Sequence, residues 1–271
     1  REVLYTGCNT LIFPEILDSR LFEGLELFGS FEHCCGEMYY RMGLMDAARA
    51  VAEKLADFFS GMKIEKVVFV CAACMNVISN VYPREFGIEL DFEKQFISDW
   101  LMERIESGKL AIKKRNCGDT KTVTVQDSCH SKMMGREMHE SPRRLLEALG
   151  LEMVERRHTM DESLCCGIAA GCARQGVAGM AVSGLMAIEE SRRTGADQTV
   201  PYCNGCQLTL SMLRKFHPLS QGVTPMLEEV RRAAGENPDV RRTEKRAQQM
   251  MRGIARNALP RMLLPGSFFI E

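Results

Sequence analysis

Short runs of apolar and β-branched residues recur along this chain, and each one leads into a cysteine a residue or a few later. Runs of this kind, bounded by polar segments, are typical of buried strands. We therefore expect strands at 3–6, 67–70, 123–125 and 199–202, followed in turn by Cys8, Cys71, Cys129 and Cys203.

Apolar residues at helical spacing predict helices between these strands. One series runs through Leu44, Ala48, Val51, Leu55 and Phe58. A second runs through Val177, Met180, Leu185 and Ile188, with Arg192 and Arg193 before Gly195 as a C-terminal stop. An apolar helix is also expected through Val223, Met226, Leu227 and Val230, ending at Gly235. Strands that alternate with helices predict an α/β fold with parallel sheets, whose functional loops lie at the carboxyl ends of the strands.

The cysteines occur as two sets that repeat each other. The first set is Cys8, Cys34, Cys35, Cys71 and Cys74, and the second is Cys129, Cys165, Cys166, Cys203 and Cys206. The two sets are offset by 121 residues at the first cysteine and by 131 or 132 at the others, so about ten residues are missing between Cys8 and Cys34. This repeat predicts two similar half-domains, each with a small parallel sheet flanked by helices. The five thiols of a half then meet at one edge of its sheet.

Composition limits the classes of function. With 35 basic and 36 acidic residues the net charge is −1, which argues against nucleic acid as the main partner. No apolar run approaches the roughly 18 residues of a membrane-spanning helix. The 12 cysteines in 271 residues are too few for a disulfide-stapled scaffold, and a chain of this length can build a core without staples.

Five converging thiols allow several kinds of chemistry. Adjacent cysteines pair as disulfides only under strain, and a thioredoxin-like Cys-x-x-Cys pair leaves three thiols of each half unused. Zinc takes four ligands and is the alternative for one half. An iron–sulfur cluster suits soft thiolates from several loops, with Gly36 and Gly167 allowing close backbone approach and the following helices directing their positive ends at an anionic core. Cys117 and Cys172 lie outside the repeat and are interpreted as a linker thiol and a packing residue.

The doubled pattern resembles the cysteine-rich CCG domain of heterodisulfide reductase, found in the B-type subunit of that enzyme and in the catalytic part of its D-type subunit. The resemblance covers roughly residues 1 to 230. The second half is the closer match, and the motifs that carry the resemblance are Asp127-Ser128-Cys129-His130, Ser141-Pro142-Arg143, Leu164-Cys165-Cys166-Gly167, Gly195-Ala196-Asp197 and, in the first half, Cys71-Ala72-Ala73-Cys74 with Tyr82-Pro83 and Phe86-Gly87.

The resemblance implies that each set of five cysteines holds one non-cubane 4Fe-4S cluster. The two clusters would face each other across the interface of the half-domains, with a disulfide substrate between them that is reduced to two thiols. On this basis the predicted catalytic residues are Cys8, Cys35, Cys129, Cys166 and His130. His130 is a candidate general acid, and the alternative is that it only donates a hydrogen bond that tunes a cluster. Lys132 and His33 are weaker candidates of the same kind.

Related CCG proteins suggest an alternative function. In glycolate, lactate and glycerol-3-phosphate oxidation such domains act as electron relays toward a quinone or membrane carrier. Because all ten cysteines are present here, we favour the catalytic component of a disulfide reductase. Electrons must come from iron–sulfur or flavin subunits of a larger complex, since the chain has no dinucleotide fingerprint. We expect a cytoplasmic protein of anaerobic metabolism that touches a membrane only through a partner.

The expected organisation has three parts. Residues 1–117 form the first CCG half-domain, 118–235 the second, and 236–271 a basic tail. The tail is interpreted either as a solvated helix with a terminal strand or as a docking arm for a partner subunit. In the D-type relatives a ferredoxin-like segment precedes the CCG domains, and we expect the complete polypeptide to carry one before Arg1.

Overall fold

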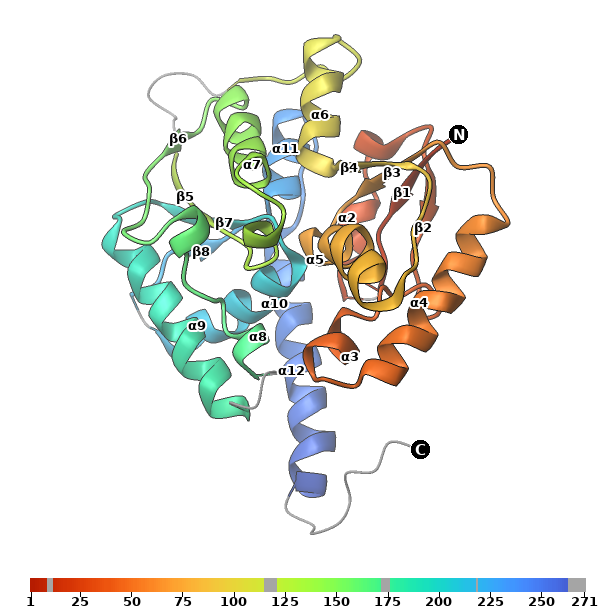
Figure 1. The fold of residues 1–271 in the computed structure, drawn as a ribbon. Helices are drawn as coiled ribbons and strands as arrows, with labels where there is room; N and C mark the ends of the chain where they lie inside the picture. Colours follow the sequence, from red (N-terminus) through yellow and green to blue (C-terminus); the bar gives the residue numbers. More distant parts are fainter. Residues whose placement is uncertain (9–11, 115–120, 172–175, 218, 263–271) are drawn as a thin grey trace.

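The computed structural model contains two parallel sheets, each of four strands and each flanked by helices (Figure 1). The structure describes residues 1–8, 12–114, 121–171, 176–217 and 219–262. The expected boundary near residue 118 and the residues Cys117 and Cys172 therefore lie outside the described residues. Within that part of the chain, no helix combines the length and apolar character needed to cross a bilayer.

The first half is built on the strand order β2-β1-β3-β4. The expected strands are β1 and β3, whose side chains are almost all fully buried. The elements of this half are β1 (Glu2–Tyr5), α2 (Pro14–Leu17), η1 (Arg20–Phe22), β2 (Glu26–Phe28), α3 (Glu37–Arg41), α4 (Met45–Ser60), β3 (Lys66–Phe69), α5 (Ala72–Asn76), the π-helix η2 (Val77–Phe86), β4 (Glu93–Phe96) and α6 (Ile97–Glu106).

The second half has the same parallel order, β6-β5-β7-β8, so the internal repeat is confirmed at the level of the sheet. Its expected strands are β5 and β7. The elements are β5 (Thr122–Gln126), η3 (Ser131–Met133), α7 (Glu137–Ala148), β6 (Glu152–Met153), η4 (Met160–Glu162), α8 (Ile168–Ala170), α9 (Gly176–Arg193), β7 (Gln198–Pro201), α10 (Asn204–Leu213), η6 (Arg214–Phe216), β8 (Gly222–Val223), α11 (Met226–Ala233) and the long helix α12 (Val240–Met262).

Two details differ from the sequence prediction. Each sheet has two strands beyond those expected from apolar runs, β2 and β4 in the first sheet and β6 and β8 in the second. Val223, expected in a helix, lies in β8 and pairs with Thr199 of β7, so the last apolar helix begins only at Met226. Proline at position 225 explains this boundary, because it fixes an extended backbone before the first helical turn.

The missing ten residues of the first half have a structural consequence. The second half contains the twelve-residue α7 after its first cysteine, where the described residues of the first half contain the four-residue α2 and the turn η1. The C-terminal part of the chain contacts this shortened segment. Arg231 donates to the backbone carbonyls of Glu15 and Asp18, both at 2.9 Å, and Glu236 accepts from Ser19 Oγ at 2.8 Å.

The two halves pack against each other along a continuous seam. Helices α6 and α7 lie side by side (Figure 1), and Ser98 and Ser141 share a hydrogen bond of 2.5 Å between them. Below the seam, α12 contacts both halves through Arg246 with Glu15 (3.0 Å) and through Glu244 with Arg214 (3.4 Å). The cysteine edges of both sheets therefore face one another within one packed body.

Close packing of α9 leads to a stability prediction. A Cβ on Gly184 would lie 2.8 Å from the carbonyl oxygen of Cys166 and 2.2 Å from Leu213 Cδ1, whereas a Cβ on Gly253 of α12 would meet nothing within 4 Å. We expect Gly184→Ala to lower the free energy of unfolding by about 1–3 kcal/mol through overpacking, in spite of alanine's better helix propensity. Urea unfolding of oxygen-free protein would measure this.

The matched control is Gly253→Ala in α12. It should raise the free energy of unfolding by about 0.5–1 kcal/mol, because only the helix propensity changes. Equal effects of the two substitutions would contradict the packing argument.

Candidate functional site

The carboxyl ends of four buried strands carry the cysteines. Cys8 follows β1 and Cys129 follows β5, while Cys71 and Cys203 follow β3 and β7. Cys71 and Cys203 are the N-cap residues of α5 and α10, and their backbones are nearly identical, with φ −118° and ψ 123° in one and φ −112° and ψ 131° in the other. The repeat seen in the sequence is thus also a repeat of local geometry.

Each Cys-Cys-Gly motif forms a tight turn before a short helix. Gly36 and Gly167 have positive φ angles of 75° and 104°, a conformation that glycine adopts without strain. Their amides donate to the thiols of Cys34 (3.4 Å) and Cys165 (3.3 Å).

The open side of Gly167 faces helix α9. A Cβ there would lie 2.2 Å from Met180 O of α9, so this glycine permits close helix packing and a left-handed turn. At Gly36 the nearest atom to such a Cβ is on Val51 of α4, at 3.2 Å. A Cβ on Gly7 would lie 3.2 Å from Cys74 Sγ, and a Cβ on Gly205 would lie 3.8 Å from Cys203 Sγ.

The ten repeated cysteines form a chain of neighbouring thiols, and none of them is in a disulfide. Within each half, the Cys-Cys pair contacts the Cys-x-x-Cys pair, and the two halves meet where Cys71 contacts Cys203. Hydrogen-bonding contacts run in the order Cys8, Cys34, Cys35, Cys74, Cys71, Cys203, Cys206, Cys166, Cys165. Cys129 interacts electrostatically with Cys165 and Cys203. The two sets are therefore adjacent as well as equivalent.

In each Cys-Cys pair, one thiol donates a hydrogen bond and the other accepts it. The hydrogen bond from Cys35, with a second from Cys8, lowers the pKa of Cys34 to about 3. The hydrogen bond from Cys166, aided by the Gly167 amide, lowers the pKa of Cys165 to about 5. The pKa values of Cys35 and Cys166 are correspondingly raised. Thiolate is the form that binds metal, so Cys34 and Cys165 are the members of the two Cys-Cys pairs that more readily bind a soft cation.

A buried cation behind the second set supports an anionic occupant. Arg156 is 6% exposed and donates through Nη1 to Gln126 at 2.5 Å, yet among the described residues its Nε and Nη2 atoms have no hydrogen-bond partner. It interacts electrostatically with Glu190, Asp127 and the Cys206 thiol. Because an unneutralised buried charge is costly, a negatively charged group at these thiols would compensate it. The donor set and this charge both fit an iron–sulfur group.

Among the described residues, no group of three or more His, Cys, Asp or Glu side chains is arranged to hold a metal ion. The thiols extend as a row across both halves. A multi-iron core takes its ligands over a wider volume than one ion does.

Side chains of the first half reach across the seam to the second set. Arg41 Nη2 lies 3.9 Å from Cys129 Sγ and 2.7 Å from Nε2 of His130. Glu37 Oε1 lies 3.1 Å from the same His130 nitrogen, and Asn76 Nδ2 lies 3.1 Å from Nδ1. His130 is thus buried with both ring nitrogens occupied. A cavity of about 250 Å³ opens beside it, lined by Tyr40, Arg41, Asn76, Val77, Asn80, Val81, Arg84, Cys129, His130 and Met133.

The weaker candidates have structural partners. Lys132 donates to the carbonyl of Ser163 at 2.8 Å. His33 contacts Ser30 Oγ through Nδ1 at 2.8 Å and packs its ring on Phe58. Both therefore hold loops next to cysteines.

A buried ion pair positions the loop that carries Cys129. Asp127 accepts hydrogen bonds from Arg143 at 2.8 and 2.9 Å, from the amide of Met160 at 2.8 Å and from Tyr202 Oη at 3.2 Å. Burial opposes ionisation of Asp127, but the bonds from Arg143 and His139 outweigh it and depress its pKa. Since Tyr202 precedes Cys203, this network ties the ends of β5 and β7 together. Asp127 and Arg143 thus have a positioning role that the motif alone did not reveal.

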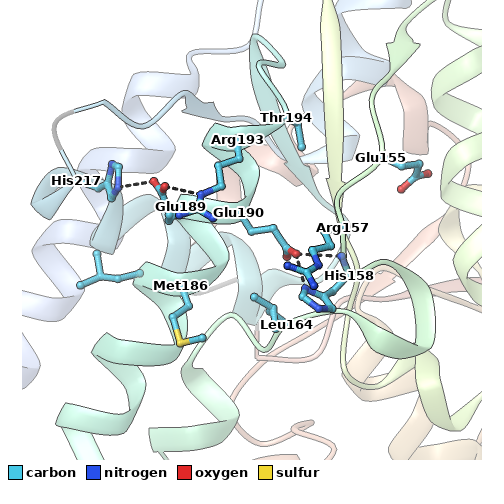
Figure 2. Close-up of a pocket in the computed structure, with 11 residues that line it drawn as sticks. Glu155, Arg157, His158, Leu164, Met186, Glu189, Glu190, Arg193, Thr194 and His217 are labelled. Atoms are coloured by element: carbon cyan, nitrogen blue, oxygen red, sulfur yellow. Dashed lines mark hydrogen bonds and ion pairs between the residues drawn. The ribbon is translucent and has the colours of Figure 1, made fainter.

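The second half also contains a larger cavity of about 600 Å³, which none of the ten cysteines lines (Figure 2). Its charged side chains pair with each other. His158 lies 2.6 Å from Glu190, and Glu189 contacts both His217 (3.1 Å) and Arg193 (2.8 Å). These pairs hold α9 against the neighbouring loops.

The sequence of this chain is similar to those of several known proteins. The chain is 30% identical over 224 residues to the D-type subunit of the dihydromethanophenazine:CoB–CoM heterodisulfide reductase of Methanosarcina barkeri, covering 77% of this chain and 53% of that protein. It is 28% identical to a probable membrane-anchored ferredoxin of Chromohalobacter salexigens, covering 68% and 27% of the two chains. An EtfAB:quinone oxidoreductase of Syntrophomonas wolfei is 26% identical, covering 53% and 19%.

The chain spans about half the length of the reductase subunits that it matches. The cysteine-rich CCG domain family matches residues 13–79 and 123–211, which together make up more than half of the chain. Each matched region lies within one of the two halves of the chain. This chain belongs to the CCG cysteine-rich domain family.

Proposed function

We propose that this chain is the catalytic iron–sulfur subunit of a heterodisulfide reductase-like complex, which reduces a disulfide to two thiols. The observation that carries the proposal is the row of nine contacting thiols with Cys129 beside it, in which two equivalent sets meet at Cys71 and Cys203. Breaking a disulfide takes two electrons and two protons, and two like sites can supply one electron each. Similarity to the D-type subunit of the reductase supports the same assignment.

The residues that would hold the two groups are the ten repeated cysteines, one non-cubane 4Fe-4S cluster for each set of five. When bound, the clusters supply electrons singly and offer iron as a binding partner for sulfur. The protein itself contributes the seam between the two halves as the place where the substrate binds. We place the disulfide in the cavity of about 250 Å³ beside Cys129, where Arg41 and Asn76 orient it and the walls exclude bulk water. His130 lies on the same wall and is the candidate proton donor to a departing thiolate.

In this proposal electrons enter from an iron–sulfur or flavin subunit, since the given sequence carries no dinucleotide fingerprint. We propose that the basic segment 236–271 contributes to docking that subunit. The start of α12 is anchored by buried Thr243, which donates to Glu228 at 2.7 Å, and by buried Ala247. A rigid helix that is fixed at one end to both halves could present its remaining turns to a partner. Contact with a membrane would then pass through that partner.

A second candidate function is electron relay toward a quinone. It is favoured by the similarity to an EtfAB:quinone oxidoreductase and to a probable membrane-anchored ferredoxin. In a relay the same row of thiols would carry two groups in series, and the cavity at the seam would have no substrate.

Metal analysis is the first test. We expect about eight irons with matching acid-labile sulfide and no zinc per chain, measured on protein purified without oxygen. Cys35→Ala and Cys166→Ala should each lose about half of the iron, because each removes a ligand of one set only. Both variants should lose disulfide reduction, while Cys117→Ala, outside the repeat, should keep iron and turnover.

Two outcomes would contradict the proposal. About four irons with one zinc would make one half structural and favour the relay. Disulfide turnover that survives the loss of either set would exclude a reaction that needs both.

The role of His130 is tested by His130→Gln. If His130 donates a proton to the leaving thiolate, turnover should fall about 10²–10⁴-fold while the iron content and the reduction potentials stay unchanged. Anaerobic disulfide assays and potentiometry monitored by EPR give both readouts. His33→Gln is the matched control beside the first set and should leave turnover within about twofold of the unaltered protein. A shift in potential without the loss of turnover would assign His130 a tuning role instead.

A further inference from the structure

One short helix connects the two thiol sets. Helix α3 begins directly after Cys34, Cys35 and Gly36, which belong to the first set, and ends at Arg41. From there the Arg41 guanidinium crosses the seam, and its Nη2 lies 3.9 Å from Sγ of Cys129 in the second set. A cation that the first half provides is therefore placed on a cysteine of the other half.

Arg41 is held in this position from two sides. Glu37, one turn earlier on α3, forms an ion pair with Arg41 Nε, and its Oε1 also contacts His130 Nε2 at 3.1 Å. Arg41 Nη2 lies 2.7 Å from the same nitrogen. The side chains are largely buried, with 24% of Arg41 and 14% of Glu37 exposed. Burial strengthens the electrostatic effect of the guanidinium, because water screens it less.

The internal repeat does not reproduce this arrangement. With the offset of 131 residues between the Cys-Cys-Gly motifs, the position of Glu37 corresponds to Ile168 and that of Arg41 to Cys172. The position of Asn76 corresponds to Leu208 at the offset of 132. The thiols are duplicated, but the equivalent sequence positions of the second half carry no counterpart of Glu37, Arg41 or Asn76, and Arg41 is directed at the second set.

We propose that Arg41 is a positioning residue of the second site. Its positive charge raises the reduction potential of the group bound there and leaves the reduction potential of the group at the first site unchanged. This inference rests on the proposed iron–sulfur function. Adding an electron makes the site more negative, and a fixed positive charge at Cys129 stabilises the reduced form more than the oxidised form. Electrons would therefore collect at the site that borders the cavity.

Arg41 and Glu37 carry opposite charges, so their positions relative to Cys129 decide the sign of the effect on the reduction potential. Arg41 presents Nη2 to Cys129 Sγ at 3.9 Å, whereas the carboxylate of Glu37 is directed at Arg41 Nε and at His130 Nε2. The net influence of the Glu37–Arg41 pair on Cys129 is therefore positive.

The test is stepwise potentiometric reduction of the intact protein, followed by EPR. The step that disappears in Cys166→Ala belongs to the second site. In Arg41→Leu that step should move to lower potential by the equivalent of about a tenfold change in the equilibrium constant, which is about 59 mV for one electron. The step that disappears in Cys35→Ala should stay in place. Arg41→Lys keeps the charge and should recover most of the shift.

The matched control is Arg84→Leu. Arg84 lines the same cavity and pairs with Glu85 and Tyr40, and its removal should leave the second step unmoved. An unmoved second step in Arg41→Leu, or an equal movement of both steps, would overturn the inference. If Arg41→Leu does not hold iron at the second site, Arg41→Gln and Arg41→Lys decide: a lower potential in the glutamine variant supports the inference, and equal potentials refute it.

Failure of the underlying function gives a different result. Unaltered protein without iron would refute the iron–sulfur proposal itself. Iron at both sites with a potential that does not respond to Arg41 would refute only this inference.

Discussion

The contact between Cys71 and Cys203 is the constraint on which the arrangement of the site depends. Each thiol caps a helix that follows a fully buried parallel strand, so its position is fixed by the core of its own half. Parallel strands place all their carboxyl ends at one edge, and two such edges can be brought together only face to face. From this contact the rows of thiols extend away from the seam on either side, while Cys129 stays at the seam beside Arg41.

Where the two cysteine-bearing sheet edges meet, polar side chains at the seam need hydrogen-bond partners from the opposite half. Burying such groups without partners would cost more than the packing contributes. Here His130 is enclosed by Glu37, Arg41 and Asn76, and Ser98 bonds to Ser141. The shortened segment of the first half leaves room that the C-terminal part of the chain covers, through Arg231 and Arg246. The deletion and the added helix α12 are therefore parts of one structural solution.

The sequence predicted the features that depend on local pattern. The strands before Cys8, Cys71, Cys129 and Cys203, the long helices α4 and α9 and the repeat of two parallel sheets are all confirmed. Strand β4 was missed because Glu-Lys-Gln-Phe has no apolar run, and it forms only by pairing with β3. The positions of Arg41 and Arg156 could not be predicted, since both depend on tertiary packing that no spacing encodes. The packing of Gly167 against α9 was not predicted for the same reason.

The two halves share their thiols but differ in the side chains that line the cavity. Thiols are repeated because each metal group needs the same donors, whereas the cavity needs walls of different origin. Arg41 and Asn76 come from the first half, and Cys129 and His130 from the second, so the cavity exists only in the docked pair. A single half could hold a cluster but would offer a substrate only an open sheet edge. In the proposed function, the chemistry that distinguishes a reductase from a simple electron carrier is therefore located at the seam, where the repeat is broken.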